Sequence, residues 1–186
     1  MTMLPGKLKA IEERLNEVLD APNLQRLSDV LVLHVEPESL VATMTTLRDD
    51  EFLDFKLLSD LCGVHWPQRD KPFEVVYQLL SVYRNHRLRV KVGLAEGQAL
   101  DTVIPVWSSA NWFEREVYDM FGVRFIGHPD LRRILMDYDF HGHPLRKDFP
   151  LVGEYQVRFD AKSYRVIREP VQLARPRREA YGRNEP

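Results

Sequence analysis

Residues able to ligate a metal or transfer a proton are concentrated between Asn111 and Phe149 of the 186-residue chain. Side chains suited to zinc or iron stand there at His128, Asp137, Asp139, His141 and His143. No pair of these histidines has the spacing of ligands on one helix, and His128 and His143 each precede a proline in a turn-like sequence. The spacing favours histidines of turns or protein contacts, so no metal site is predicted. A soluble metalloenzyme using His128, His141 and His143 is the alternative.

The sequence also contains few residues whose spacing suits acid–base or nucleophilic catalysis. Glu114 and Glu116 are carboxylates in one predicted helix, but residues two apart point to different sides of a helix. A Gly-x-Ser-x-Gly motif, a phosphate loop and a dinucleotide fingerprint are missing from the sequence. Cys62 lies in an apolar segment, where burial is expected to keep its thiol neutral. No catalytic or cofactor-binding residue is therefore predicted.

Composition narrows the class of protein further. A single cysteine excludes an internal disulfide and any iron–sulfur or cysteine-based zinc site built by this chain alone. Hydrophobic residues make up 44% and charged residues 29%, as in globular proteins. The longest apolar run, Val30–Leu33, is far shorter than the roughly 20 residues of a spanning helix. The start at Met1 has no apolar signal segment, which favours a cytosolic, reducing compartment.

Charge is unevenly distributed along the chain. Residues 1–60 contain six Lys/Arg and twelve Asp/Glu, whereas residues 61–186 contain twenty and sixteen. Basic residues alternate on a predicted strand and recur near the C-terminus, at Arg87, Arg89, Lys91, Arg175, Arg177 and Arg178. The strand residues are predicted to decorate the solvent face of a sheet. An RNA-binding module is a further alternative, which this modest basic excess supports only weakly.

The elements that must position these residues follow from hydrophobic periodicity and breakers. Helices are predicted at residues 5–20, from Pro37 through Leu47, and from Ser108 or Ser109 to Phe121, and strands at residues 30–35, 55–66, 73–83, 87–92 and 103–106. The central pair, with Asn85-His86 as its turn, reads as a hairpin. This order predicts an α+β fold with a mostly antiparallel sheet flanked by helices.

The helix ending at Phe121 has two different faces. Apolar residues occupy one arc, and Trp112, Arg115, Glu116 and Asp119 occupy a neighbouring arc, with Arg115 and Asp119 spaced as an ion pair. Gly122 is predicted to end the helix in the left-handed conformation. The charged stripe is either a solvated, ion-paired surface or a contact surface for another protein.

Residues 151–186 form the second predicted domain, after a globular domain of residues 1–150. They lack long apolar periodicity and contain Gly153, Pro170, Pro176 and Gly182. Ordering such a segment costs about 1–2 kcal/mol per residue in backbone entropy. An extended C-terminal tail is therefore predicted, either mobile or laid along a partner.

Two stretches carry a family resemblance. Residues 114–135, Glu-Arg-Glu-Val-Tyr-Asp-Met-Phe-Gly-Val-Arg-Phe-Ile-Gly-His-Pro-Asp-Leu-Arg-Arg-Ile-Leu, closely resemble the diagnostic segment of the 30 kDa, or C-type, subunit family of respiratory complex I, the proton-pumping NADH:quinone oxidoreductase. Residues 142–151, from Gly142 to Leu151, are similar to the next characteristic run of that family. The motif's fixed positions are all retained, and chain length and element order agree with the resemblance.

The resemblance implies a peripheral-arm subunit that carries no flavin, cluster or quinone of its own, in a translocase that as a whole uses FMN, iron–sulfur clusters and quinone. It implies a hetero-oligomer in which this chain packs against the 49 kDa, or D-type, quinone-site subunit and lays its C-terminal segment across it. Membrane association is then indirect, on the cytoplasmic side of the bacterial inner membrane or, alternatively, the matrix side of the mitochondrial inner membrane. Related subunits of energy-converting hydrogenases and other quinone-linked dehydrogenases are the alternative context.

The residues expected at the interface combine the charged stripe with the motif's basic and histidine positions. They are Trp112, Arg115, Glu116, Asp119, His128, Arg132, Arg133, Arg146 and Lys147. Aromatic and arginine side chains commonly anchor protein contacts, which favours this set.

Overall fold

The computed structural model describes residues 5–27, 29–153 and 155–171. The chain divides into two compact units, residues 1–149 and 150–186.

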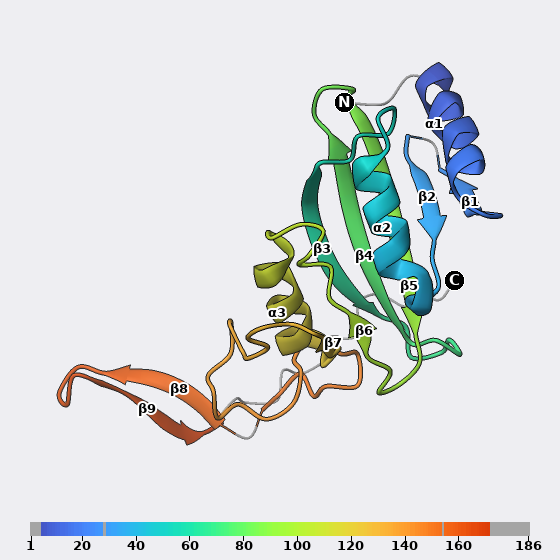
Figure 1. Ribbon diagram of the computed structural model, residues 1–186. Helices are drawn as coiled ribbons and strands as arrows, with labels where there is room; N and C mark the ends of the chain where they lie inside the picture. Colours follow the sequence, from blue (N-terminus) through green and yellow to red (C-terminus); the bar gives the residue numbers. More distant parts are fainter. Residues whose placement is uncertain (1–4, 28, 154, 172–186) are drawn as a thin grey trace, which may run out of the picture. The chain divides into compact units, whose positions relative to one another are not determined.

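The first unit is built on a five-stranded sheet with strand order β1-β2-β5-β4-β3 (Figure 1). Its strands are β1 (Asn23–Arg26), β2 (Leu31–His34), β3 (Leu57–His65), β4 (Phe73–Ser81) and β5 (His86–Leu94). Neighbouring strands pair antiparallel except β2 and β5, which run parallel. The predicted α+β class with a mostly antiparallel sheet is confirmed. Strand β1 was not predicted, because only Leu24 among its four residues is apolar.

Helices supply the second layer of this unit. They are α1 (Pro5–Val18), the short 3-10 helix η1 (Pro37–Ser39), α2 (Leu40–Asp49) and α3 (Ala110–Phe121). Figure 1 shows α2 crossing one face of the sheet. Among the described residues, no helix has both the length and the apolar character needed to span a bilayer.

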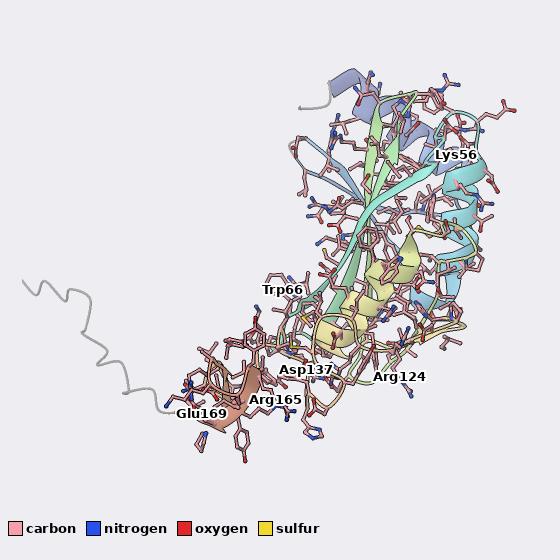
Figure 2. All side chains as sticks on the ribbon, turned by 90° about the vertical axis from the view of Figure 1, so that its left-hand side faces the viewer. Lys56, Trp66, Arg124, Asp137, Arg165 and Glu169 are labelled. Carbon is pink, nitrogen blue, oxygen red and sulfur yellow. The ribbon has the colours of Figure 1, made fainter. Side chains whose placement is uncertain are left out.

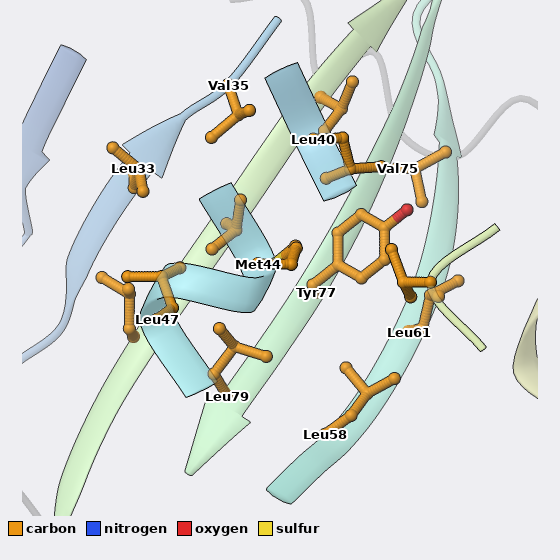
Figure 3. Packing of buried hydrophobic residues seen from close by; sticks show 14 of the residues in the cluster. Leu33, Val35, Leu40, Met44, Leu47, Leu58, Leu61, Val75, Tyr77 and Leu79 are labelled. Atoms are coloured by element: carbon orange, nitrogen blue, oxygen red, sulfur yellow. The ribbon is translucent and has the colours of Figure 1, made fainter. Parts of the chain in front are cut away.

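The core lies between the helices and that face of the sheet. Leu88, Val90 and Val92 of β5 are buried in it, while the alternating residues Arg87, Arg89 and Lys91 point away, as predicted. Figure 3 shows Tyr77 of β4 between Met44 of α2 and Leu61 of β3. Tyr77 is fully buried, and no side chain or backbone group of the described residues bonds its hydroxyl.

The predicted strand at Val103–Val106 is wrong. These residues form a turn in which the N–H groups of Val106 and Trp107 both donate to the Val103 carbonyl, each at 2.9 Å. The strand lies earlier, as β6 (Leu100–Asp101), and pairs in parallel with β7 (Phe125–Ile126). The Val103 N–H cannot join a ladder because it donates to the carboxylate of Glu114.

The second unit contains an antiparallel hairpin that differs from the extended tail expected there. Its strands are β8 (Tyr155–Asp160) and β9 (Arg165–Pro170). Tyr155, Val157 and Phe159 alternate with polar residues, and this short period was hidden by the surrounding prolines and arginines. Figure 2 marks Arg165 and Glu169 on β9. The basic cluster Arg175, Arg177 and Arg178 lies outside the described residues.

Candidate functional site

Helix α3 carries the motif residues and ends where the sequence predicted. Gly122 follows it with φ of 81°, in the left-handed region, and its N–H donates to the Tyr118 carbonyl. The positive φ disfavours any residue with a side chain at this position. A Cβ atom here would also lie 2.7 Å from the His143 ring. The helix therefore stops against the second motif stretch of the sequence.

Asp119 is the most heavily hydrogen-bonded carboxylate of the site. It is fully buried, and its Oδ1 accepts a bond from Arg133 Nη1 at 2.6 Å. Its Oδ2 accepts three backbone N–H groups, from Ile134, Leu135 and Met136, at 3.0, 2.8 and 2.9 Å. Burial alone would raise the pKa of Asp119, but the Met136 N–H, Arg133 and the other donors outweigh it and hold this pKa below its usual range.

Arg115 holds the same loop from the neighbouring turn of the helix. Its Nε and Nη2 donate to the carbonyl oxygens of Arg132 and Arg133, at 3.1 and 3.0 Å. The alternative of a solvated, ion-paired stripe is wrong for two of its four members, since Arg115 and Asp119 are buried. Their predicted ion pair is also wrong, because Asp119 pairs with Arg133 and Arg115 binds backbone carbonyls.

The two motif stretches of the sequence meet at the C-terminal end of α3. His143 Nδ1 donates to the Asp119 carbonyl at 3.0 Å, and the Leu145 N–H donates to the Met120 carbonyl at 3.1 Å. Arg133 Nη2 donates to the Gly142 carbonyl at 2.9 Å. His143 and Leu145 of the second stretch thus bind carbonyl groups that the helix leaves without internal partners, and Arg133 links the first stretch to the second.

Glu114 faces the sheet side of α3 and holds a different segment. Its carboxyl group bonds the Thr102 hydroxyl at 2.5 Å and the Val103 N–H at 2.8 Å. Burial raises the pKa of Glu114 to about 7, although both bonds oppose the shift. Burial, together with the charge of Glu114, also raises the pKa of Tyr77. Glu116 is exposed, so the two glutamates do face different sides.

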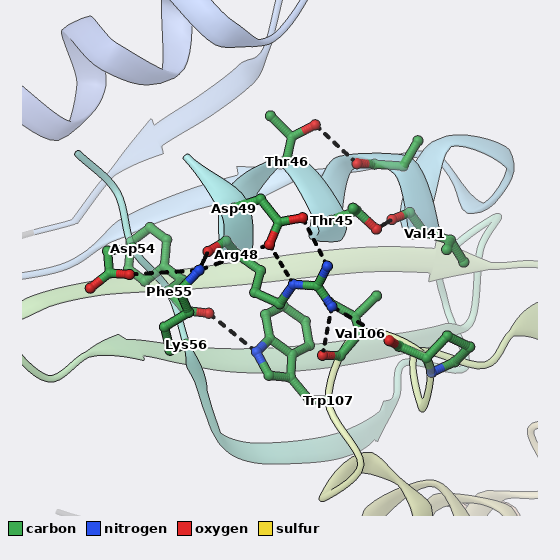
Figure 4. Close-up of polar contacts among 12 residues, drawn as sticks. Val41, Thr45, Thr46, Arg48, Asp49, Asp54, Phe55, Lys56, Val106 and Trp107 are labelled. Atoms are coloured by element: carbon green, nitrogen blue, oxygen red, sulfur yellow. Dashed lines mark hydrogen bonds and ion pairs between the residues drawn. The ribbon is translucent and has the colours of Figure 1, made fainter. Parts of the chain in front are cut away.

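The segment that Glu114 holds is fixed at its other end to α2 and to the chain segment between α2 and β3. Arg48 Nη1 donates to the Val106 carbonyl at 3.2 Å, and Trp107 Nε1 donates to the Phe55 carbonyl at 3.2 Å (Figure 4). Lys56 in turn donates to the Arg48 carbonyl near the end of α2. The start of α3 is therefore anchored from both sides.

Of the histidines of this region, His128 takes part in a turn, as the spacing predicted. His128 Nδ1 accepts the Asp130 N–H at 3.0 Å, which leaves Nε2 to donate to the Asn111 carbonyl at 3.1 Å. His141 is exposed, and His143 caps α3. In the part of the chain that the structure describes, no group of three or more His, Cys, Asp or Glu side chains is arranged to hold a metal ion.

Arg146 and Lys147 connect the second motif stretch to the sheet. Arg146 lies over the Phe73 ring, 4.9 Å from its centroid, and its Nη2 donates to Glu96 at 2.8 Å. The Lys147 N–H donates to His65 Nδ1 at 2.9 Å, while its side chain is exposed.

The nine predicted interface residues thus fall into three groups. Trp112, Glu116, Arg132 and Lys147 are exposed; His128, Arg133 and Arg146 are half-buried; Arg115 and Asp119 are buried. Their role at an interface remains a prediction. The structure adds a bonded pair to the candidate site, Glu114 and Thr102, which the sequence analysis did not place together. Glu114 had one local signal, a glutamate among the apolar positions of the helix.

Cys62 corrects another prediction, since it is exposed on β3. It alternates with Leu61 and Gly63, which face the core side of the sheet. The pKa of its thiol is raised, first by partial desolvation and then by the charge of Asp60, so the thiol is neutral as predicted.

Fold and site together define a class of protein: an α+β domain whose motif side chains hold an irregular loop and a helix end rather than converge on a reaction centre. The model of the family described as the 30 kDa subunit of respiratory-chain NADH dehydrogenase matches residues 33–155. The chain belongs to this family, which confirms the resemblance.

Similar proteins agree with this assignment. The C-type subunit of NADH-quinone oxidoreductase from Methylobacterium sp. (strain 4-46) is 49% identical over 176 residues, covering 94% of this chain and 82% of that protein. The corresponding protein of Brucella abortus (strain 2308) is 52% identical over 163 residues, 88% of this chain and 80% of that protein. A chain in the structure of the membrane-bound sulfane sulfur reductase, an archaeal respiratory membrane complex, has a TM-score of 0.67 at 25% identity, covering 78% of this chain and 87% of that chain.

Proposed function

We propose that this chain is a structural subunit of the peripheral arm of a proton-translocating NADH:quinone oxidoreductase, with no catalytic activity of its own. Identity of about half over most of the chain to proteins named as the C-type subunit of that enzyme carries the proposal. The bonding of Arg115, Asp119 and Arg133 within the chain supports a scaffolding role for the motif. FMN, iron–sulfur clusters and quinone then belong to other subunits of the enzyme.

The proposed neighbour is the 49 kDa, D-type subunit that forms the quinone site. The exposed members of the predicted interface set, together with the exposed apolar residues of the hairpin β8–β9, support an extensive contact with another protein. The enzyme is then held at the cytoplasmic side of a bacterial inner membrane through its other subunits.

A second context is favoured by the structural similarity to a chain of the sulfane sulfur reductase complex. In that case the chain would serve a related respiratory membrane complex other than NADH:quinone oxidoreductase. The subunits that accompany the chain separate the two contexts.

The test is purification of the tagged, full-length chain from its own membranes in mild detergent. The expected result is a multi-subunit assembly that oxidises NADH and reduces quinone, while the chain purified alone does neither. Removal of the chain should abolish assembly, and its return should restore it. A compact monomer that converts a small molecule unaided would overturn the proposal.

A further inference from the structure

Where α3 meets the sheet, the carboxyl group of Glu114 lies at the centre of a small buried polar network. Glu114 is completely buried, and within the described residues no lysine, arginine or histidine side chain bonds its carboxyl group. Its two oxygen atoms have one partner each: Oε1 accepts the Val103 N–H, and Oε2 lies 2.5 Å from Thr102 Oγ1. A buried carboxylate needs cations or several donors to offset its loss of water, so these two neutral partners favour the protonated group.

Tyr77 of β4 is a second unusual polar group beside this network. Its side chain is completely buried, and no group of the described residues bonds its hydroxyl. The charge of Glu114 contributes to the raised pKa of Tyr77, so the two groups lie close together. Tyr77 is therefore near enough to be affected by a charge on Glu114, yet it donates no hydrogen bond that would stabilise that charge.

The charged and titratable side chains of the elements around Glu114 are engaged elsewhere or exposed. They are Arg48 and Asp49 of α2, Asp60, Cys62 and His65 of β3, Glu74 of β4, Asp101 of β6, Arg124 before β7, and Arg115, Glu116, Tyr118 and Asp119 of α3. No side-chain charge is thus among the causes that set the pKa of Glu114: burial raises it, and the bonds to Thr102 and Val103 lower it.

Residues 102–107, here called the Thr102 segment, connect β6 to the start of α3 without regular secondary structure. Glu114 holds one end of the segment, and the Trp107 indole, which binds the chain before β3, holds the other (Figure 4). Val103 is buried and Pro105 is exposed, so the segment reaches from the carboxyl group to the surface. A shift of this segment alone would therefore admit water to Glu114.

The proton on Glu114 decides how this carboxyl group bonds Thr102. A neutral carboxyl group donates its proton from Oε2 to Thr102 Oγ1, which also accepts the Ile104 N–H at 3.2 Å. An ionised carboxylate can only accept, from the Thr102 hydroxyl and the Val103 N–H. Loss of the proton to solvent thus leaves a buried negative charge with two neutral donors, and contact with water relieves that cost.

We propose that Glu114 is a pH-dependent switch that holds the Thr102 segment closed when it is protonated and opens the segment when it is ionised. Opening brings the carboxylate into water, frees the Val103 N–H and loosens the chain that leads into α3. The helix that carries the family motif then has a weaker anchor at its start. This inference concerns the chain itself and goes beyond the proposed function, on which it does not depend.

Amide hydrogen exchange of the full chain, followed by NMR between pH 4.5 and pH 8, measures the opening. After correction for the intrinsic pH dependence of exchange, the opening equilibrium of the Val103, Val106 and Trp107 N–H groups should rise on the order of 100-fold over this range. The rise follows because opening returns the pKa of Glu114 from about 7 to its ordinary value of 4.5. Glu114→Gln should remove the rise, and the matched control Glu116→Gln should keep it.

The carboxyl carbon resonance of Glu114 gives the midpoint of the switch in the same titration. The midpoint should lie near pH 7, and Thr102→Val should move it upward, because the Thr102 hydroxyl stabilises the ionised form. A midpoint below pH 5, or one that Thr102→Val leaves unchanged or lowers, would overturn the inference.

The exchange data can contradict the switch in two further ways. One is an opening equilibrium that stays constant with pH, or that rises equally in Glu114→Gln. The other is exchange of the segment's N–H groups at pH 8 no faster than that of Val90 and Val92 in the core strand β5, since the segment would then open only when the whole chain unfolds. Association with oxidoreductase subunits affects none of these results, so this inference and the proposed function can fail separately.

Discussion

Two buried carboxyl groups on α3, Glu114 and Asp119, have opposite environments although both are fully shielded from solvent. Asp119 meets a guanidinium and three backbone N–H groups, which hold its pKa low. Glu114 meets one hydroxyl and one N–H, and burial raises its pKa to about 7. The number and charge of the donors, rather than burial, separate the two groups.

Glu114 should make stability fall as the pH rises. Its pKa is raised on folding from 4.5 to about 7, so the folded chain binds the proton more tightly between these values. Ionisation above pH 7 then costs about 3 kcal/mol, at about 1.4 kcal/mol per unit. Glu114→Gln should be more stable than wild type at pH 8 and lose that advantage near pH 4.5, measured by urea unfolding. Glu116→Gln, at an exposed position, should show no such crossover; equal pH profiles in all three chains would contradict the raised pKa.

Asp119→Asn should destabilise the chain by about 3–5 kcal/mol, because it breaks the ion pair of a fully buried carboxylate and leaves the half-buried Arg133 without a countercharge. An amide also has to direct its NH₂ group at either Arg133 or three N–H donors. Urea unfolding measures the loss. The matched control is Asp130→Asn, which breaks an exposed pair with Arg132 and should cost less than about 1 kcal/mol. Similar losses in both variants would contradict a special role for Asp119.

At the scale of elements, the packing of α3 against β3 depends on a glycine. A Cβ atom at Gly63 would lie 2.6 Å from the Phe121 ring, so the ring occupies the space of a side chain. This close approach brings the C-terminal turn of α3, with Asp119 and Gly122, against the sheet. The hydrophobic period of either element alone does not reveal it.

Gly63→Ala should therefore cost about 1–3 kcal/mol through overpacking. Gly93→Ala is the control, since its Cβ would meet Lys71 Cδ at 3.1 Å and that flexible side chain can move. Thermal unfolding of both chains measures the difference. Combining Gly63→Ala with Phe121→Leu should recover part of the loss; no recovery would place the strain elsewhere.

At the scale of the whole molecule, the hydrophobic core belongs to one unit. Its buried members run from Leu8 to Phe125, and the partly buried residues packed against it end at Met136. A two-stranded hairpin such as β8–β9 has marginal stability by itself. Folding of residues 1–149 should thus not depend on the ordering of the second unit.

A chain ending at Pro150 should keep the urea unfolding midpoint of the full chain. It should nonetheless enter the membrane assembly less well, because the exposed apolar residues of β8–β9 would be missing from the contact surface. Detergent extraction and native electrophoresis measure the second effect. A large drop in the unfolding midpoint would contradict the independence of the core, and unimpaired assembly would contradict a binding role for the second unit.

The sequence by itself determined the α+β class, the strands of the central hairpin, the limits of the helix at Ala110–Phe121 and the family. These features depend on local periodicity, on Gly122 as a helix stop and on a long motif. Each of these can be recognised from residues that are close together in the sequence. The turn predicted at Asn85-His86 is wrong, because His86 already pairs with Ser81 and the turn lies at residues 82–85. The alternation in Tyr155–Phe159 was equally local, and it was obscured by neighbouring prolines and arginines.

Only the tertiary structure decided what the charged residues of α3 do. Periodicity assigns Arg115 and Asp119 to one side of a helix, but their partners are backbone groups of residues 132–136. A buried charge is tolerated when a distant segment satisfies it, and such long-range pairing leaves no local pattern. The same reason hid the bond between Glu114 and Thr102, and with it the turn at Val103–Val106.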